Sequence, residues 1–98
     1  MLLNKEIILQ RLKEAKPQLQ EKYQLESLAL FGSYARNEQT ERSDIDIMLS
    51  LKNKSFKNYL SLIESIETLF PQTEVQVVSR EAIKPQYFEA LKYDLIYA

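Results

Sequence analysis

Three chemically important residue types are absent or nearly absent from this chain of 98 residues. It has no cysteine, which excludes disulfides, thiolate nucleophiles and thiolate-bound zinc. It has no histidine, which excludes the commonest general base, Ser-His triads and imidazole-bound metals. Its single glycine, Gly32, cannot supply a GxGxxG dinucleotide loop or a Walker A loop. Any chemistry must therefore come from carboxylates, hydroxyls, lysine and arginine, and we expect a hard metal ion to assist them.

Neither sign of charge is in excess, since 13 Lys and Arg residues face 14 Asp and Glu residues and the pI is near 5.5. Because nucleic-acid backbones are bound by a basic surplus, this balance disfavours a free-standing DNA or RNA binder.

Long apolar runs are also missing, so we expect no membrane span. Charges at Lys5 and Glu6 come too early for a signal-peptide core, and we expect a cytoplasmic protein. The length and the 45% hydrophobic content indicate one globular domain over residues 1–98.

Apolar residues at helical spacing predict several helices. The first region runs from Asn4 to Tyr23, and because Pro17 interrupts it we expect a helix to about Ala15 and a second helix from Pro17. Residues 33–43 can hold one short helix, and residues 80–92 are expected to be helical in two pieces around a proline. A further helix of about four turns is expected to end at a proline. Its apolar stripe, which we assign to the core, consists of Phe56, Tyr59, Ile63, Ile66 and Phe70.

Shorter segments predict three or four strands. Residues 27–31 are apolar and end at Gly32, and residues 74–78 and 94–97 predict a third strand and a short terminal strand. Residues 44–51 alternate, which places Ile45 and Ile47 on one face and Asp44 and Asp46 on the other. The fold class we predict is a two-layer α/β (α+β) arrangement, in which helices pack on one face of a small mixed sheet.

The connections bring polar residues to one end of this predicted sheet. A short link favours antiparallel pairing of the first two strands, and the helix before the third strand favours parallel pairing there. Asp44 and Asp46 then point the same way, with Cα atoms roughly 6.5–7 Å apart, which suits Mg²⁺. Next to them, Gly32 allows close backbone approach, and Ser33 offers a hydroxyl and an amide at a helix start, which suits phosphate.

Each half of this pattern has a simpler interpretation. A glycine-serine pair is often only a turn with a helix cap, and aspartates two apart are often only the solvent face of a strand. Their coincidence at one end of the sheet favours a site.

Arg36 and Arg42 can reach phosphates, but ion pairs with Glu38 or Glu41 are at least as reasonable, so we place both outside the site. Three tyrosines lie near the C-terminus: Tyr87, Tyr93 and Tyr97. Such tyrosines are more often packed in the core or half-buried, although they could also mark a partner surface.

The segment Gly32-Ser33-Tyr34-Ala35-Arg36, followed by Ser43-Asp44-Ile45-Asp46-Ile47, resembles the signature of DNA polymerase beta-like nucleotidyltransferases. More narrowly it resembles the minimal nucleotidyltransferases, the antitoxin partners of HEPN toxins. The resemblance covers nearly the whole chain and implies that residues 1–98 form a single domain with the nucleotidyltransferase fold. It implies an enzyme that uses ATP and two Mg²⁺ ions to move AMP to a hydroxyl, namely a tyrosine of a HEPN-type toxin. It also implies a hetero-oligomer with that toxin, without direct contact to nucleic acid or membrane.

Carried over by position, Gly32 and Ser33 would hold the triphosphate, and Asp44 and Asp46 would be the catalytic metal ligands. The third carboxylate of the family falls on Gln76, which can offer a neutral oxygen to a metal but cannot act as a base. Glu74, one pleat repeat away, is a candidate partial substitute. The resemblance therefore leaves two interpretations: an active adenylyltransferase, or a catalytically impaired protein of that fold that acts as a toxin-binding module. A second departure is Asn37, in a loop position where the family often has glycine.

Overall fold

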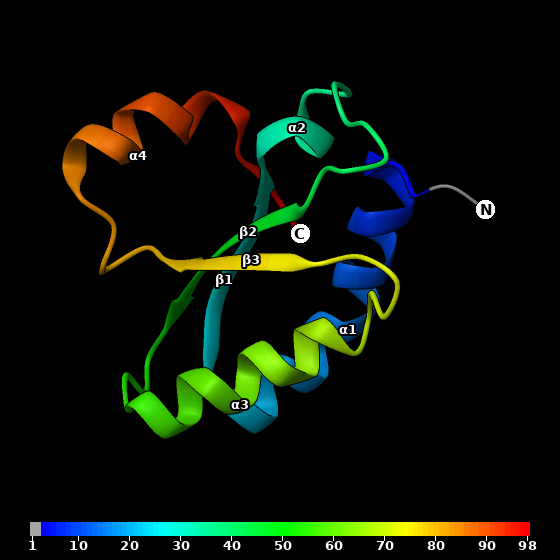
Figure 1. Ribbon diagram of the computed structural model, residues 1–98. Helices are drawn as coiled ribbons and strands as arrows, with labels where there is room; N and C mark the ends of the chain where they lie inside the picture. The colour runs from blue at the N-terminus through cyan, green and yellow to red at the C-terminus, as the bar shows by residue number, and fades with distance from the viewer. Residues whose placement is uncertain (1–2) are drawn as a thin grey trace.

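A four-stranded mixed sheet organises the chain (Figure 1). The computed structural model describes residues 3–98. Its strand order is β3-β2-β1-β4, with β1 antiparallel to β2 and β4, and β2 parallel to β3. The predicted pairings are therefore confirmed. In chain order the elements are α1 (Lys5–Tyr23), β1 (Leu25–Phe31), α2 (Gly32–Ala35), β2 (Ile45–Leu51), α3 (Phe56–Glu67), β3 (Val75–Ser79), α4 (Pro85–Leu91), the 3₁₀ helix η1 (Lys92–Asp94) and β4 (Ile96–Tyr97).

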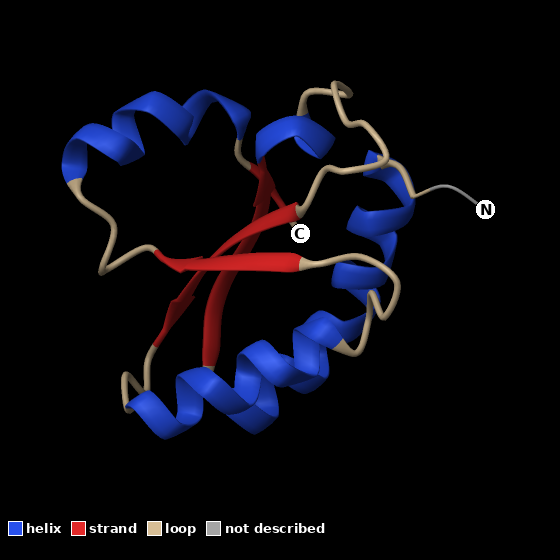
Figure 2. Ribbon diagram, in the orientation of Figure 1, coloured by secondary structure: helices blue, strands red, loops and turns tan. Residues whose placement is uncertain are grey.

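The hydrophobic core lies between one face of the sheet and the helices α1 and α3, which cover that face (Figure 2). In β2, Ile45, Ile47 and Leu49 are completely buried in this core, as their alternation predicts. Helix α4 lies beyond the opposite side of the sheet and buries none of its residues fully. The predicted fold class, a small mixed sheet with helices packed on its core face, is confirmed. Within residues 3–98, no helix combines the length and apolar character needed to cross a bilayer.

Helix α1 is continuous, so the expected break at Pro17 is wrong. A proline inside a helix removes one hydrogen bond and costs about 3 kcal/mol. The helix persists because its buried residues lie on both sides of the proline, with Ile8 and Leu12 before it and Leu19 and Tyr23 after it. Packing against the sheet therefore aligns the two halves. Pro17 itself is exposed, which leaves the unpaired carbonyl one turn earlier accessible to water.

The stripe predicted for α3 is only partly correct. Ile66 and Phe70 are buried as expected, but Phe56 is 72% exposed, and Leu62 is the helix residue that fills the core beside Ile66. Phe56 is the first residue of the helix, immediately after the capping Ser55, and so it lies beyond the covered part of the sheet. There it lines an apolar groove of about 470 Å³.

Residues 80–84 form turns rather than the first of two helical pieces, which corrects that expectation. Lys84 is extended, with ψ 144, because the residue before a proline disfavours the helical region. Pro85 then starts α4, since its fixed φ and missing N–H suit the first position of a helix. Only the piece after the proline is therefore an α-helix, and it continues into η1.

Candidate functional site

Three strand termini meet at one end of the sheet. Phe31, the last residue of β1, pairs with Asp46 near the start of β2, and Asp46 pairs with Gln76 near the start of β3. Gly32 follows Phe31 directly and begins α2. The structure therefore brings Gly32, Asp46 and Gln76 together, as the topology inferred from the sequence requires.

Gly32 lies directly against the Asp46 carboxylate. Its φ of +78 belongs to the left-handed region, which glycine adopts without steric cost. A Cβ atom built on Gly32 would lie 2.2 Å from Oδ2 of Asp46 and 3.0 Å from its Cγ. Because any side chain would displace the carboxylate, glycine is what allows the backbone of the turn and the acid to meet.

The two aspartates form an acidic pair whose charge is only partly compensated. Burial raises the pKa of Asp46, the negative charge of Asp44 raises it further, and the positive charge of Arg36 lowers it. Gln76 donates a hydrogen bond from Nε2 to Oδ2 of Asp44, at 3.1 Å. A cation between the two carboxylates would relieve their repulsion, and hard oxygen ligands of this kind suit Mg²⁺. The residues present therefore fit such an ion.

The third position of this group is occupied by an amide rather than an acid. Gln76 is hydrogen-bonded to Asp44, so its side chain lies beside the acidic pair, where a third metal ligand would stand. Glu74 precedes β3, and its carbonyl accepts a hydrogen bond from the Ile45 N–H at 2.9 Å, while the residue itself is exposed. Among residues 3–98, no three carboxylates gather closely enough to hold a metal ion. Glu74 therefore does not extend the acidic pair to three.

The loop after α2 is held by its own backbone. The carbonyl of the half-buried Ser33 accepts a hydrogen bond from the Glu38 N–H at 2.8 Å. Asn37 has a φ of +59, which is the conformation that glycine favours and that asparagine tolerates better than most other residues. The replacement of glycine by Asn37 is therefore compatible with the loop conformation.

Arg36 links this site to the C-terminal segment. Its Nη1 lies 2.6 Å from Oδ2 of Asp94 in η1, and its Nε lies 3.4 Å from a carboxylate oxygen of Glu38. The pair with Glu38 is one of those expected from the sequence. The pair with Asp94 was missed, because 58 residues separate the partners and no local pattern connects them.

The comparisons with known proteins agree with this fold and arrangement. The fold is that of the nucleotidyltransferases, whose solved structures superpose on nearly the whole chain. Residues 4–97 match the family model described as polymerase beta, nucleotidyltransferase. The chain belongs to this family.

Two relatives are named as protein adenylyltransferases. One protein of Methanocaldococcus jannaschii, named provisionally as a protein adenylyltransferase, is 43% identical over 90 residues, which cover 88% of this chain and 89% of the relative. The protein adenylyltransferase MntA of Thermococcus cleftensis is 28% identical over 83 residues, which cover 84% and 83% of the two chains.

Two solved structures share the fold of this chain. A structure described provisionally as a minimal nucleotidyltransferase has a TM-score of 0.77 and 25% identity, and the match covers 96% of this chain and 95% of that one. A chain of an MntA–HpeT toxin–antitoxin crystal structure has a TM-score of 0.62, and the match covers 97% and 71%. At 19% identity the second likeness shows the fold alone. The predicted kinship with minimal nucleotidyltransferases is confirmed.

Proposed function

We propose that residues 1–98 form a single minimal nucleotidyltransferase domain that moves AMP from ATP to a hydroxyl of a partner protein. The partner we propose is a HEPN-type toxin, held in a hetero-oligomer in the cytoplasm. The observation that carries the proposal is the contact between the Gly32 backbone and Asp46, beside Asp44 and Gln76. The relatives named as adenylyltransferases support the reaction, and the toxin–antitoxin structure of the same fold supports the kind of partner.

In this proposal Gly32 and Ser33 hold the triphosphate through backbone amides and the serine hydroxyl. Asp44 and Asp46 would hold Mg²⁺, which neutralises phosphate charge and orients the reacting groups when bound, and two ions are expected. The hydroxyl oxygen of the acceptor attacks the α-phosphorus, the bond to pyrophosphate breaks so that pyrophosphate leaves, and the hydroxyl proton passes to solvent water. Gln76 orients Asp44 through its hydrogen bond but has no basic group with which to take that proton.

A second candidate function is favoured by that same residue. With an amide in the third position, the protein would retain the fold and the nucleotide site but transfer AMP slowly or not at all. It would then neutralise its toxin as a binding module, by covering the toxin's active surface. Because both functions require a complex with the toxin, formation of the complex does not distinguish them.

Mass spectrometry of the intact partner separates the two functions. The chain is incubated with ATP, Mg²⁺ and the HEPN-type protein encoded beside it. An adenylate increment on the partner, lost in Asp44→Asn, supports the enzyme. The matched variant Glu74→Gln should keep its activity, because Glu74 lies outside the acidic pair. No increment with the wild type, but transfer by Gln76→Asp, supports the binding module, and failure of both together with absent ATP binding contradicts both functions.

A further inference from the structure

We infer that the C-terminal segment from Lys92 to Tyr97 completes the donor site and that the ring of Tyr97 is the platform on which the nucleobase stacks. The inference rests on the proposed function, since it names the part of the site that recognises the nucleoside. Three separate observations support it: the register of the strands, the exposure of the rings and the ion pair between Arg36 and Asp94.

The strand register places Tyr97 on the same face of the sheet as the acidic pair. Residues opposite each other in a ladder share a face. Ala29 of β1 pairs with Tyr97 of β4 on one side and with Met48 of β2 on the other. Asp46 lies two residues from Met48 and so returns to the same face. Leu30, the next residue along β1, belongs to the core on the opposite face. Tyr97 therefore points away from the core, on the side of Asp46.

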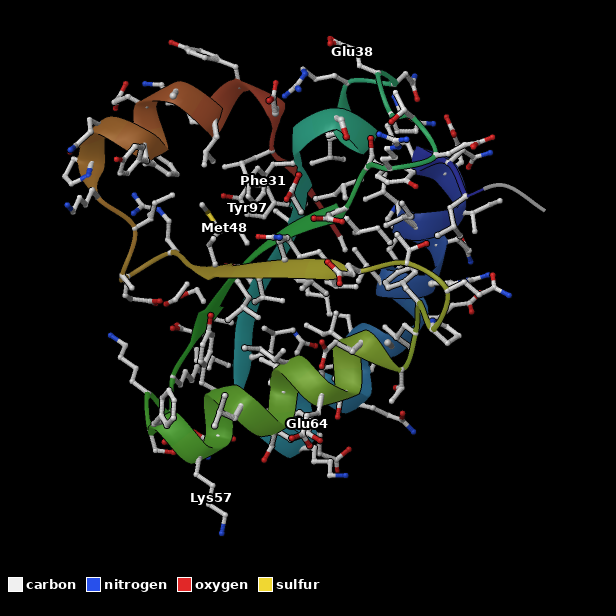
Figure 3. The ribbon with its side chains drawn as sticks, viewed as in Figure 1. Phe31, Glu38, Met48, Lys57, Glu64 and Tyr97 are labelled. Carbon is white, nitrogen blue, oxygen red and sulfur yellow. The ribbon has the colours of Figure 1, made fainter. Side chains whose placement is uncertain are left out.

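An apolar shelf connects Tyr97 to the acids, and it consists of Phe31, Met48 and Tyr97. Phe31 pairs directly with Asp46 and lies diagonally from Tyr97 in the ladder, within reach of an aromatic side chain. Figure 3 shows the three side chains gathered on the side of the sheet that faces α4. Met48 is only 3% exposed and forms the floor, whereas Phe31 is half-buried and Tyr97 is 58% exposed. The shelf therefore exposes aromatic ring surface to solvent, while the buried Met48 closes it from below.

The ion pair between Arg36 and Asp94 joins this segment to the end of α2, the helix that starts at Gly32. Arg36 caps the C-terminus of α2, which begins at Gly32, and Asp94 ends η1 just before β4. Their side chains are 2.6 Å apart. A strand of only two residues makes few ladder contacts, and Ala98 after it donates a hydrogen bond to the Leu28 carbonyl and accepts one from Lys16. The ion pair adds an attachment on the other side of Tyr97, next to the proposed triphosphate site.

The order of the strands favours the donor nucleoside over the acceptor as the occupant of the shelf. Across the sheet lie Gln76 on β3, Asp46 on β2, Phe31 on β1 and Tyr97 on β4. The acceptor is expected beside Gln76, in the third position of the site. The shelf lies on the other side of Asp46, next to Gly32, where the donor is held. Aromatic rings and a thioether are suitable partners for stacking of a nucleobase.

Calorimetric titration of the isolated chain tests the inference, with Mg²⁺-ATP and Mg²⁺-triphosphate as the two ligands. Inorganic triphosphate has no base, so the shelf should affect ATP alone. We expect Tyr97→Ala to weaken ATP binding about five- to twentyfold while leaving triphosphate binding unchanged, and Tyr97→Phe to bind both as the wild type does. The matched control is Tyr93→Ala, because Tyr93 is 85% exposed in the same segment but does not belong to the shelf. Asp94→Asn should weaken ATP more than triphosphate.

Five outcomes would overturn the inference. Unchanged ATP affinity in Tyr97→Ala would show that the ring does not contact the base. Equal weakening of both ligands, or a large fall in Tm, would assign Tyr97 a purely structural role. Normal ATP affinity with loss of transfer to the toxin would place the ring against the protein acceptor instead. If the wild type binds neither ligand, the proposed function fails first and the inference fails with it.

Discussion

Gly32→Ala should both destabilise the protein and disrupt the candidate site, because the added methyl group strains the backbone and crowds the Asp46 carboxylate. The left-handed backbone at φ +78 costs alanine about 1–2 kcal/mol. The new Cβ would lie 2.2 Å from Oδ2 of Asp46, whereas ordinary contact begins near 3.4 Å, so the carboxylate must rotate away. A displaced side-chain torsion costs a further ~0.5–1.5 kcal/mol. We expect a total loss of about 2–3 kcal/mol in the free energy of unfolding, or roughly 10–20 °C in Tm for a chain of this size.

Urea unfolding followed by circular dichroism measures this loss, and a titration with Mg²⁺-ATP measures the damage to the site. The matched control is Asn37→Ala, which also puts alanine at a positive φ but away from the acids. It should cost about 1 kcal/mol or less and leave ATP affinity unchanged. In a double-mutant cycle, Asp46→Ala should restore the part of the loss caused by crowding. The reasoning is refuted if Gly32→Ala costs no more than Asn37→Ala and still binds ATP normally.

Three further predictions test separate parts of the structure. Burial and the charge of Asp44 raise the pKa of Asp46, so the folded protein holds this proton to a higher pH than the unfolded chain. The contribution of Asp46 to stability should therefore fall as the pH rises from about 3.8 through the raised pKa. Asp46→Asn should lack that fall, and at pH 7 without metal it should be more stable than the wild type by up to about 1 kcal/mol, because solvent screens this partly exposed carboxylate. Urea midpoints across pH 4–7 that show a less stable variant would contradict this. Burial acts to raise the pKa of Glu81, but the hydroxyls of Ser50 and Ser79, a backbone hydrogen bond and the positive charge of Lys54 together lower it below its ordinary value. The contribution of this carboxylate to stability is therefore present above pH 4.5 and is lost in acid. Glu81→Gln should therefore lower the free energy of unfolding by up to about 1 kcal/mol at neutral pH and by nothing once the carboxyl is protonated. An equal loss at neutral and acid pH would count against the hydrogen bonds from the serine hydroxyls to Glu81. Leu62→Ala should lower the free energy of unfolding by about 2–5 kcal/mol, whereas Phe56→Ala should lower it by about 0.5 kcal/mol. If urea unfolding gives similar losses for the two variants, α3 packs differently from the structure.

The parts of the fold that were predicted from sequence depend on short-range patterns. Alternation along β2 identified which residues enter the core, because a strand turns successive side chains to opposite faces. The short link before Asp44 and the helix before β3 determined the two pairings, and through them the meeting of Gly32, Asp46 and Gln76. The resemblance to a family signature then supplied the chemistry that the residues alone left open.

The parts that were not predicted depend on contacts between distant segments. The continuity of α1 through Pro17 comes from packing against the sheet, which outweighs a local preference. Phe56 follows the helical pattern of the core stripe but lies beyond the end of the sheet that would cover it. The ion pair between Arg36 and Asp94, and the position of Tyr97 on the face of the acids, exist only because β4 returns to pair with β1.

The most direct test of the proposed site is a calorimetric titration of ATP with and without Mg²⁺, into the wild type and into the double variant Asp44→Asn/Asp46→Asn. If the two aspartates and the glycine-serine turn hold a magnesium-bound triphosphate, the wild type binds ATP only when Mg²⁺ is present and the folded double variant does not bind it. Equal affinity in the two proteins, or binding by the wild type that is indifferent to Mg²⁺, would show that the nucleotide is not held by these residues.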